Sequence, residues 1–130
     1  MRERLGKELL FLDGAMATVL QERGLKPGEL PETWNLKRKE EIIEIHRQYY
    51  EPGSDIVLSN TFGANALKFH DEDCSLREII FAAVDNVKTA RALAGKDDGR
   101  HYAALDIGPT GKLLEPMGDL SFDEAYEAFA

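Results

Sequence analysis

Only one cysteine, Cys74, and one tryptophan, Trp34, occur in the 130-residue sequence. A single cysteine cannot form a disulfide within the chain, and this composition fits a reducing compartment, so we expect a cytoplasmic protein. No stretch approaches the roughly 18 consecutive apolar residues that a membrane helix needs. The first residues also lack the apolar core of a secretory signal, so we expect neither membrane association nor export.

Basic residues are scarce relative to acidic ones. The sequence has 16 Lys and Arg against 24 Asp and Glu, which gives a formal net charge of -8. Nucleic acids and anionic membrane surfaces attract basic proteins, so this balance argues against both as partners.

Short apolar runs alternate with longer segments of helical periodicity. The run at residues 9–12 has no polar alternation, which is typical of a parallel strand covered on both faces. Ser75 has a glutamate three residues later, the spacing of a capping box, and Ser121 repeats the pattern. The predicted strands are residues 9–12, 55–59 and 101–107. The predicted helices are residues 16–23, 37–51, 66–70, 75–94 and 122–130, and residues 25–36 are predicted to form a loop.

The order of these elements predicts an α/β fold. Strands separated by helices pair in parallel through right-handed crossovers. Three strands of buried type would leave apolar faces and backbone groups uncovered at the edges of the sheet. We therefore expect residues 1–130 to be the N-terminal portion of a (β/α)8 TIM barrel, about three of its eight units. A self-contained small α/β domain is the alternative.

Polar residues follow each predicted strand, at residues 13–18, 59–65 and 106–111. In a barrel these loops converge on one mouth. Together they offer two carboxylates, an amide, hydroxyls and several glycines, which suits a small polar ligand such as an amino acid. Carboxylates would meet its ammonium group, and hydroxyl and backbone N–H groups would meet its carboxylate. Ordinary turn chemistry is the alternative interpretation of each loop taken singly.

Six segments, in order, resemble those of the homocysteine S-methyltransferase family. The resemblance is closest to the N-terminal homocysteine-binding domain of cobalamin-dependent methionine synthases. The matching segments are residues 11–16, 31–36, 45–49, 53–56, 59–65 and 106–111.

The resemblance implies a (β/α)8 barrel with a catalytic zinc at its C-terminal face. In that family three cysteines from late strands bind the zinc, which lowers the pKa of the homocysteine thiol, and the thiolate takes a methyl group to form methionine. The implied donor is methylcobalamin, recharged from methyltetrahydrofolate on separate cobalamin- and folate-binding domains or proteins. The zinc ligands would lie beyond residue 130, so we expect this chain alone to be inactive and assign no catalytic or metal-binding residue within it. Methyl transfer from betaine or S-methylmethionine is one alternative, and a non-catalytic α/β binding module is another.

The family match also implies contacts to homocysteine. Asp13 is expected to hold the ammonium group, and the residues after the second and third strands are expected to line or support the site. Ala17 stands where the family usually has glycine, and its methyl group is expected to tighten or displace the first turn. The implied substrate-binding residues are Asp13, Gly14, Ala15, Asn60, Thr61, Asp106 and Gly108.

The remaining distinctive residues are expected to be structural. Trp34 would either cover the ligand or plug the side of the barrel. Cys74 is expected to be a bystander thiol, and the His70–Cys74 stretch is no metal site, because consecutive residues rarely point at one ion. Helical spacing assigns four aromatic residues to the core, namely Tyr49, Tyr50, Phe69 and Phe81.

Overall fold

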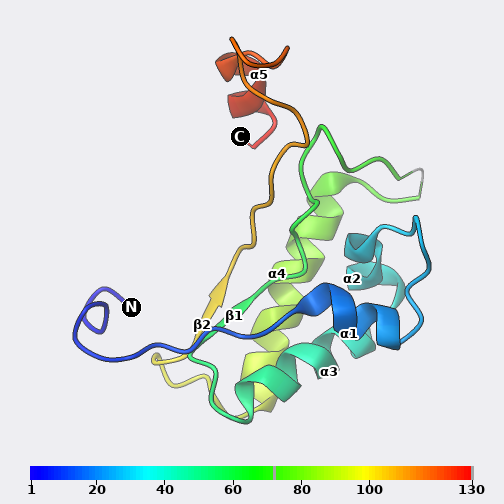
Figure 1. Cartoon of the computed structure of the whole chain (residues 1–130). Helices are drawn as coiled ribbons and strands as arrows, with labels where there is room; N and C mark the ends of the chain where they lie inside the picture. Colours follow the sequence, from blue (N-terminus) through cyan, green and yellow to red (C-terminus); the bar gives the residue numbers. More distant parts are fainter. Residues whose placement is uncertain (72, 130) are drawn as a thin grey trace.

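The computed structural model describes residues 1–71 and 73–129 (Figure 1). Helices dominate the chain, and the named strands are short. In chain order the elements are α1 (Met16–Glu22), the 3-10 turn η1 (Pro31–Thr33), α2 (Trp34–Lys37), α3 (Lys39–Tyr50), β1 (Ile56–Leu58), α4 (Leu76–Leu93), β2 (Tyr102–Ala104) and α5 (Phe122–Glu127). None of the described helices is long and apolar enough to cross a membrane.

The sheet is parallel, as the alternation of strands and helices predicted. β1 pairs with β2 in the register Ile56 to Tyr102 and Leu58 to Ala104. The predicted strand at residues 9–12 is reduced to one parallel bridge between Leu12 and Ile56. It pairs no further because the Phe11 N–H donates instead to the Asp55 side chain, at 3.0 Å.

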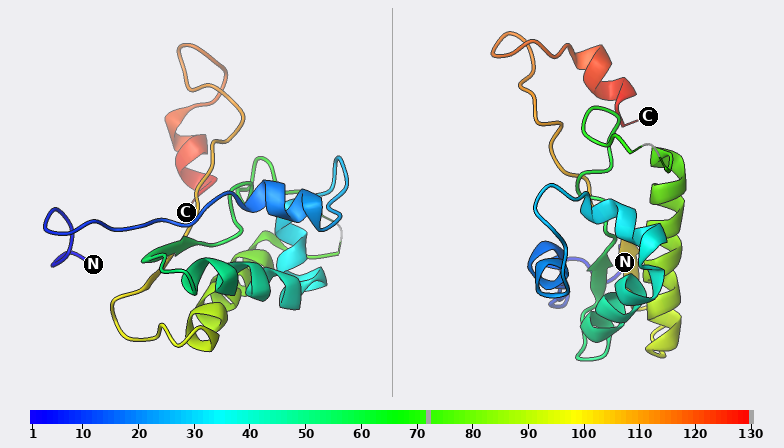
Figure 2. Two further views of the ribbon diagram at one scale, coloured as in Figure 1. Left: turned by 60° about the horizontal axis from the view of Figure 1, so that its bottom comes forward. Right: turned by 90° about the vertical axis from the view of Figure 1, so that its right-hand side faces the viewer.

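Helices cover one face of this sheet. α3 packs against α4, α2 contacts both, and α3 and α4 contact β1 and β2 respectively (Figure 2). Leu12 and Ile107 are 58% and 62% exposed. This exposure agrees with the expectation that three strands of buried type, without the rest of a barrel, leave apolar faces uncovered.

Two clusters of buried apolar side chains hold the helices in place. The first joins α1, α2 and α3, and the second joins α3, α4 and β1. Burial of such side chains is the main favourable term in folding. The clusters are Leu20, Trp34, Ile42 and Ile45, and Tyr50, Val57, Val87 and Ala90.

The helix ends follow the local signals of the sequence. Ser75 and Ser121 both form the expected capping boxes, in which the serine accepts from a backbone N–H three residues later. α1 and α4 stop just before Gly24 and Gly95, whose φ angles of 101° and 67° favour glycine. α3 begins at Lys39, two residues later than predicted, because Arg38 leaves the helical region.

Three local predictions are wrong. Part of the loop predicted at residues 25–36 folds as η1 and α2. Residues 66–70 form turns rather than a helix, since the Asn65 carbonyl accepts from the N–H groups of residues 68 and 69 and the turn is not continued. Phe81 is 63% exposed and lies against Arg77, because α4 buries a different face. Tyr50 and Phe69 are buried as predicted, and Tyr49 is partly buried.

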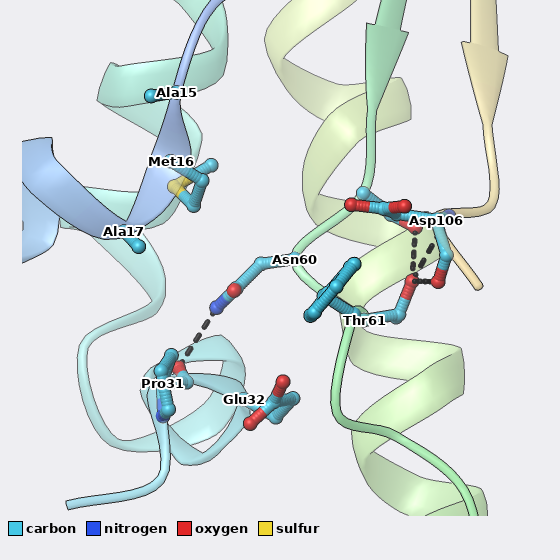
Figure 3. Close-up of a pocket in the computed structure, with 10 residues that line it drawn as sticks. Ala15, Met16, Ala17, Pro31, Glu32, Asn60, Thr61 and Asp106 are labelled. Carbon is cyan, nitrogen blue, oxygen red and sulfur yellow. Dashed lines mark hydrogen bonds between the residues drawn. The ribbon is translucent and has the colours of Figure 1, made fainter. Parts of the chain in front are cut away.

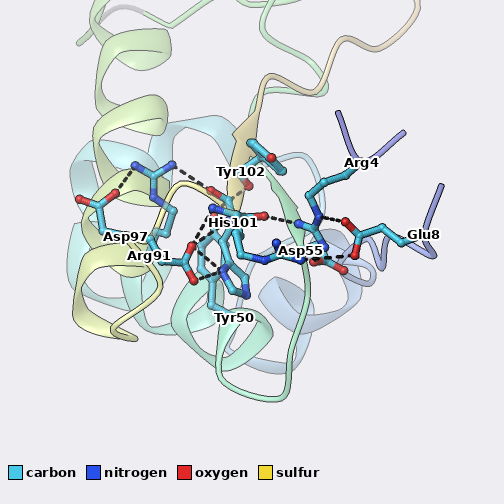
Figure 4. Close-up of polar contacts among 10 residues, drawn as sticks. Arg4, Glu8, Tyr50, Asp55, Arg91, Asp97, His101 and Tyr102 are labelled. Atoms are coloured by element: carbon cyan, nitrogen blue, oxygen red, sulfur yellow. Dashed lines mark hydrogen bonds and ion pairs between the residues drawn. The ribbon is translucent and has the colours of Figure 1, made fainter. Parts of the chain in front are cut away.

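Ion pairs gather where β1 and β2 begin (Figure 4). Arg4 Nη2 donates to Asp55 Oδ1 at 2.7 Å. The pKa of Asp55 is lowered by the Phe11 N–H and then by Arg4. Tyr50 on α3 donates to the Tyr102 carbonyl at 2.9 Å. Ion pairs and hydrogen bonds thus stabilise the end of the sheet where the strands begin. The polar loops lie at the opposite end, where the strands finish.

Candidate functional site

The loops at the carboxyl ends of the strands gather around a cavity of about 280 Å³ (Figure 3). This edge is where parallel α/β folds bind ligands. The cavity draws on the start of α1, on η1, on the loop after β1 and on the loop after β2. Its lining residues are Ala15, Met16, Ala17, Pro31, Glu32, Ser59, Asn60, Thr61, Phe62 and Asp106.

Thr61 joins the loops after β1 and β2. Its Oγ1 donates to the Asp106 carbonyl at 2.8 Å and accepts from the Asp106 N–H at 3.2 Å. Because this uses the Thr61 proton, the 2.9 Å contact with Ser59 Oγ must be donated by Ser59. The Thr61 hydroxyl therefore holds the cavity wall together.

Asn60 presents an oriented amide to the cavity. Its Nδ2 donates to the Pro31 carbonyl at 2.8 Å. Its Oδ1 has no hydrogen-bond partner in the described part of the chain. A free amide oxygen accepts but cannot donate, so it suits an N–H or ammonium group of a ligand.

Glu32 is a cavity residue that sequence reasoning missed. It is only 4% exposed, and its Oε1 accepts from the Gly63 N–H at 2.6 Å. A Cβ atom at Gly63 would lie 2.7 Å from that oxygen, so a larger residue there would displace the Glu32 carboxylate. Local sequence patterns cannot predict the contact between Glu32 and Gly63, because these residues are 31 positions apart. The contact forms because η1 packs against the loop after β1.

Two aspartates carry negative charge near the strand ends. Asp13 Oδ2 accepts from the Leu58 N–H at 3.0 Å, while its Oδ1 is buried with no partner among the described residues. Burial raises the pKa of Asp13, and the negative charge of Asp106 raises it further. The hydrogen bond from the Leu58 N–H acts in the opposite direction and lowers this pKa. Burial also raises the pKa of Asp106. A cationic ligand group would offset the cost of ionising both carboxyls.

Two glycines beside the cavity lie close to neighbouring atoms, Gly108 to backbone and Gly14 to a side chain. A Cβ atom at Gly108 would lie 2.2 Å from the Phe62 carbonyl oxygen, which accepts from the Gly108 N–H at 3.1 Å. A Cβ atom at Gly14 would lie 3.1 Å from the Tyr49 hydroxyl. Gly108 lines a second cavity of about 110 Å³ that shares Asp106 with the first.

The structure thus brings together four of the seven predicted site residues. Ala15, Asn60, Thr61 and Asp106 line the main cavity. The other three, Asp13, Gly14 and Gly108, do not line it. Ala17 lines the cavity directly, so its methyl group occupies part of the wall.

Trp34 lies in the helix layer and does not line the cavity. It is 1% exposed, packs with Leu20 and Ile42, and donates through Nε1 to Glu29 at 2.7 Å. The ligand-covering alternative for Trp34 is therefore wrong for the described chain, because the indole is enclosed between α1 and α3.

Cys74 is held in the connection before α4. Its Sγ donates to Asp71 Oδ1 at 3.3 Å, and burial raises the pKa of the thiol. Across residues 1–71 and 73–129, no group of three or more His, Cys, Asp and Glu side chains is placed to hold a metal ion.

A parallel α/β chain with a cavity at the carboxyl ends of its strands, lined by apolar side chains and a few polar ones, is of the class that binds small ligands at that edge. The family model described as homocysteine S-methyltransferase matches residues 10–130. The chain belongs to the homocysteine S-methyltransferase family, which confirms the resemblance seen in its six segments.

Named relatives agree with this assignment. The chain is 32% identical over 140 residues to methionine synthase of Mycobacterium leprae and 33% identical over 134 residues to that of Mycobacterium tuberculosis. These alignments cover 98% and 96% of this chain but 11% of each relative. The homocysteine methyltransferase MmuM from Escherichia coli, in its metallated form, matches with a TM-score of 0.69 and 28% identity. That match covers 85% of this chain and 41% of MmuM.

Proposed function

We propose that this chain forms the first part of a (β/α)8 barrel and supplies the amino-acid end of a homocysteine pocket. The proposed enzyme methylates the homocysteine thiol and forms methionine. The observation that carries the proposal is the cavity in which Glu32, Asn60 and Asp106 converge from separate loops. Membership of the homocysteine S-methyltransferase family supports the choice of ligand.

The residues around the cavity favour an ammonium group. The Glu32 and Asp106 carboxylates and the Asn60 Oδ1 are acceptors, and charge-assisted hydrogen bonds are stronger than neutral ones. Asp13 is proposed to add to this field, since its carboxyl group interacts electrostatically with Asp106 and its Oδ1 has no partner among the described residues. The chain's role is then to bind the amino acid through its ammonium group.

Zinc does not fit the side chains at residues 1–71 and 73–129. The described residues offer no cluster of three ligands, and the thiol of Cys74 is bonded to Asp71. We propose, as the family resemblance implies, that the zinc ligands come from later strands of the barrel, and that residues 1–130 serve substrate binding. Without those ligands, we expect the 130-residue chain to form no methionine.

The proposed donor system is methylcobalamin recharged from methyltetrahydrofolate, carried by cobalamin- and folate-binding domains or proteins. Betaine or S-methylmethionine is the alternative donor. A donor screen on the longest natural form of the protein separates these alternatives, with methionine as the measured product. Homocysteine binding without methionine from any donor would favour a non-catalytic binding module.

Calorimetry tests the amino-acid pocket directly. We expect L-homocysteine to bind at least about tenfold more tightly than 4-mercaptobutanoic acid, which lacks the amino group. Asp106→Asn should remove most of that preference. Asp123→Asn, on the exposed face of α5, is the matched control and should leave it unchanged. Equal affinity for the two thiols would contradict the proposed ammonium site.

A further inference from the structure

A chain of buried asparagines runs from α4 to the cavity. Asn86 Nδ2 donates to the Asn35 carbonyl at 2.9 Å, and Asn35 Nδ2 donates to the Asn60 carbonyl at 2.8 Å. Asn60 Nδ2 then donates to the Pro31 carbonyl at 2.8 Å. We call Asn86, Asn35 and Asn60 the asparagine relay. It connects α4, α2, the loop after β1 and the start of η1.

The relay is buried and incompletely satisfied. Asn86 and Asn35 are both 0% exposed, and Asn60 is 4% exposed. Within the described residues, the Oδ1 atoms of Asn86 and Asn35 have no hydrogen-bond partner. Burying an unpaired amide oxygen opposes folding, whereas the two Nδ2 bonds pair the Asn35 and Asn60 carbonyls and favour it. The amides at these two positions therefore join α4, α2 and the loop after β1 through buried hydrogen bonds.

The relay does account for the position of the cavity wall. Among the described residues, one polar contact joins α2 to residue 60. It is the hydrogen bond from Asn35 Nδ2 to the Asn60 carbonyl. Glu32 holds the same loop three residues later, through the Gly63 N–H. Together these bonds set where the Asn60 amide stands and leave its Oδ1 for a ligand.

We propose that Asn35 and Asn86 are positioning residues, which fix the loop at residues 59–65 in its ligand-binding position. The expected effect on the KM for homocysteine rests on the proposed function. The expected effect on the position of residues 59–65 does not. Neither side chain lines the cavity. Asn86 acts through the Asn35 backbone, and Asn35 acts through the Asn60 backbone.

Asn86→Ala separates positioning from packing by two measurements on the longest natural form of the protein. Hydrogen exchange of residues 59–65 should become about tenfold faster under conditions where the variant remains folded. The KM for homocysteine should rise about tenfold, while kcat stays within about twofold, because ground-state binding is lost and the reacting atoms are untouched.

Val87→Ala is the matched control. Val87 is the next residue on α4, is 1% exposed, and packs against Tyr50 and Val57 without entering the relay. It should lower stability without changing exchange at residues 59–65 or the KM. Asn86→Ser serves as a second variant if Asn86→Ala does not fold, because a serine hydroxyl can bond to its own helix but is too short to reach Asn35.

The two measurements distinguish failure of the relay from failure of the proposed function. Faster loop exchange in the Asn86 variants but not in Val87→Ala supports the relay, even if no methyl transfer to homocysteine is found. Equal changes in both kinds of variant would show a packing effect and overturn the proposal. Unchanged loop exchange and unchanged KM in folded Asn86 variants would overturn it as well.

Discussion

Acidification is expected to destabilise this chain through His46. The side chain lies on α3 and is 0% exposed. Neither ring nitrogen has a hydrogen-bond partner in the described part of the chain. Burial lowers the pKa of His46 from its ordinary 6.5 to about 4. A proton can therefore be accepted only at the cost of a buried, unpaired charge.

The direction and size of the effect follow from these two pKa values. Above pH 6.5 the imidazole is neutral in both states, so the free energy of unfolding is unaffected. Between pH 6.5 and about 4 only the unfolded state takes up the proton, so folding loses stability as the pH falls. At about 1.4 kcal/mol per pH unit, the loss is about 2 kcal/mol near pH 5 and approaches about 3 kcal/mol below pH 4.

Urea unfolding followed by fluorescence measures this loss. Trp34 is the only tryptophan of the chain and packs against Ile42 and Ile45, the neighbours of His46 along α3. Other groups also titrate, so the informative quantity is the difference between the protein and His46→Leu. We expect this difference to change by about 2 kcal/mol between pH 7 and pH 5.

His70→Gln is the control, because His70 is exposed. It should not reproduce the effect of His46→Leu. A difference between the protein and His46→Leu that stays constant from pH 7 to pH 5 would refute the reasoning, since it would mean that buried His46 takes up its proton without unfolding.

Three further substitutions test the cavity and its frame. Gly108→Ala should cost about 2 kcal/mol or more in urea unfolding, because the new Cβ would lie 2.2 Å from the Phe62 carbonyl oxygen. Ser75→Ala should cost about 1 kcal/mol in the same assay, because it removes the capping box with Glu78. Asp13→Asn should weaken homocysteine binding about tenfold in calorimetry with little change in stability, because the amide oxygen can still accept from the β1 backbone.

Each of these expectations has a contrary result. A Gly108→Ala variant as stable as the parent would mean that the two loops are not in close contact. A Ser75→Ala variant as stable as the parent would mean that the capping box does not stabilise α4, and Ser121→Ala is the matched substitution at the start of α5. Loss of folding in Asp13→Asn, or an unchanged affinity for homocysteine, would remove Asp13 from the proposed site.

Local sequence determined the elements whose hydrogen bonds close within a few residues. The capping boxes at Ser75 and Ser121 and the stops at Gly24 and Gly95 could be predicted because each depends on side-chain or φ chemistry at one helix end. The alternation of strands and helices likewise determined the parallel pairing. The six family segments determined which family the chain belongs to.

Tertiary structure alone decided which of those residues meet. The Glu32 bond to Gly63 and the Asn86 bond to Asn35 join residues 31 and 51 apart, a separation that no periodic pattern encodes. Phe81 faces solvent because only one side of α4 packs against the rest of the chain. The sequence determined local conformation through nearby hydrogen bonds, whereas the packing of helices on one face of the sheet decided the cavity, the relay and the exposed strand face.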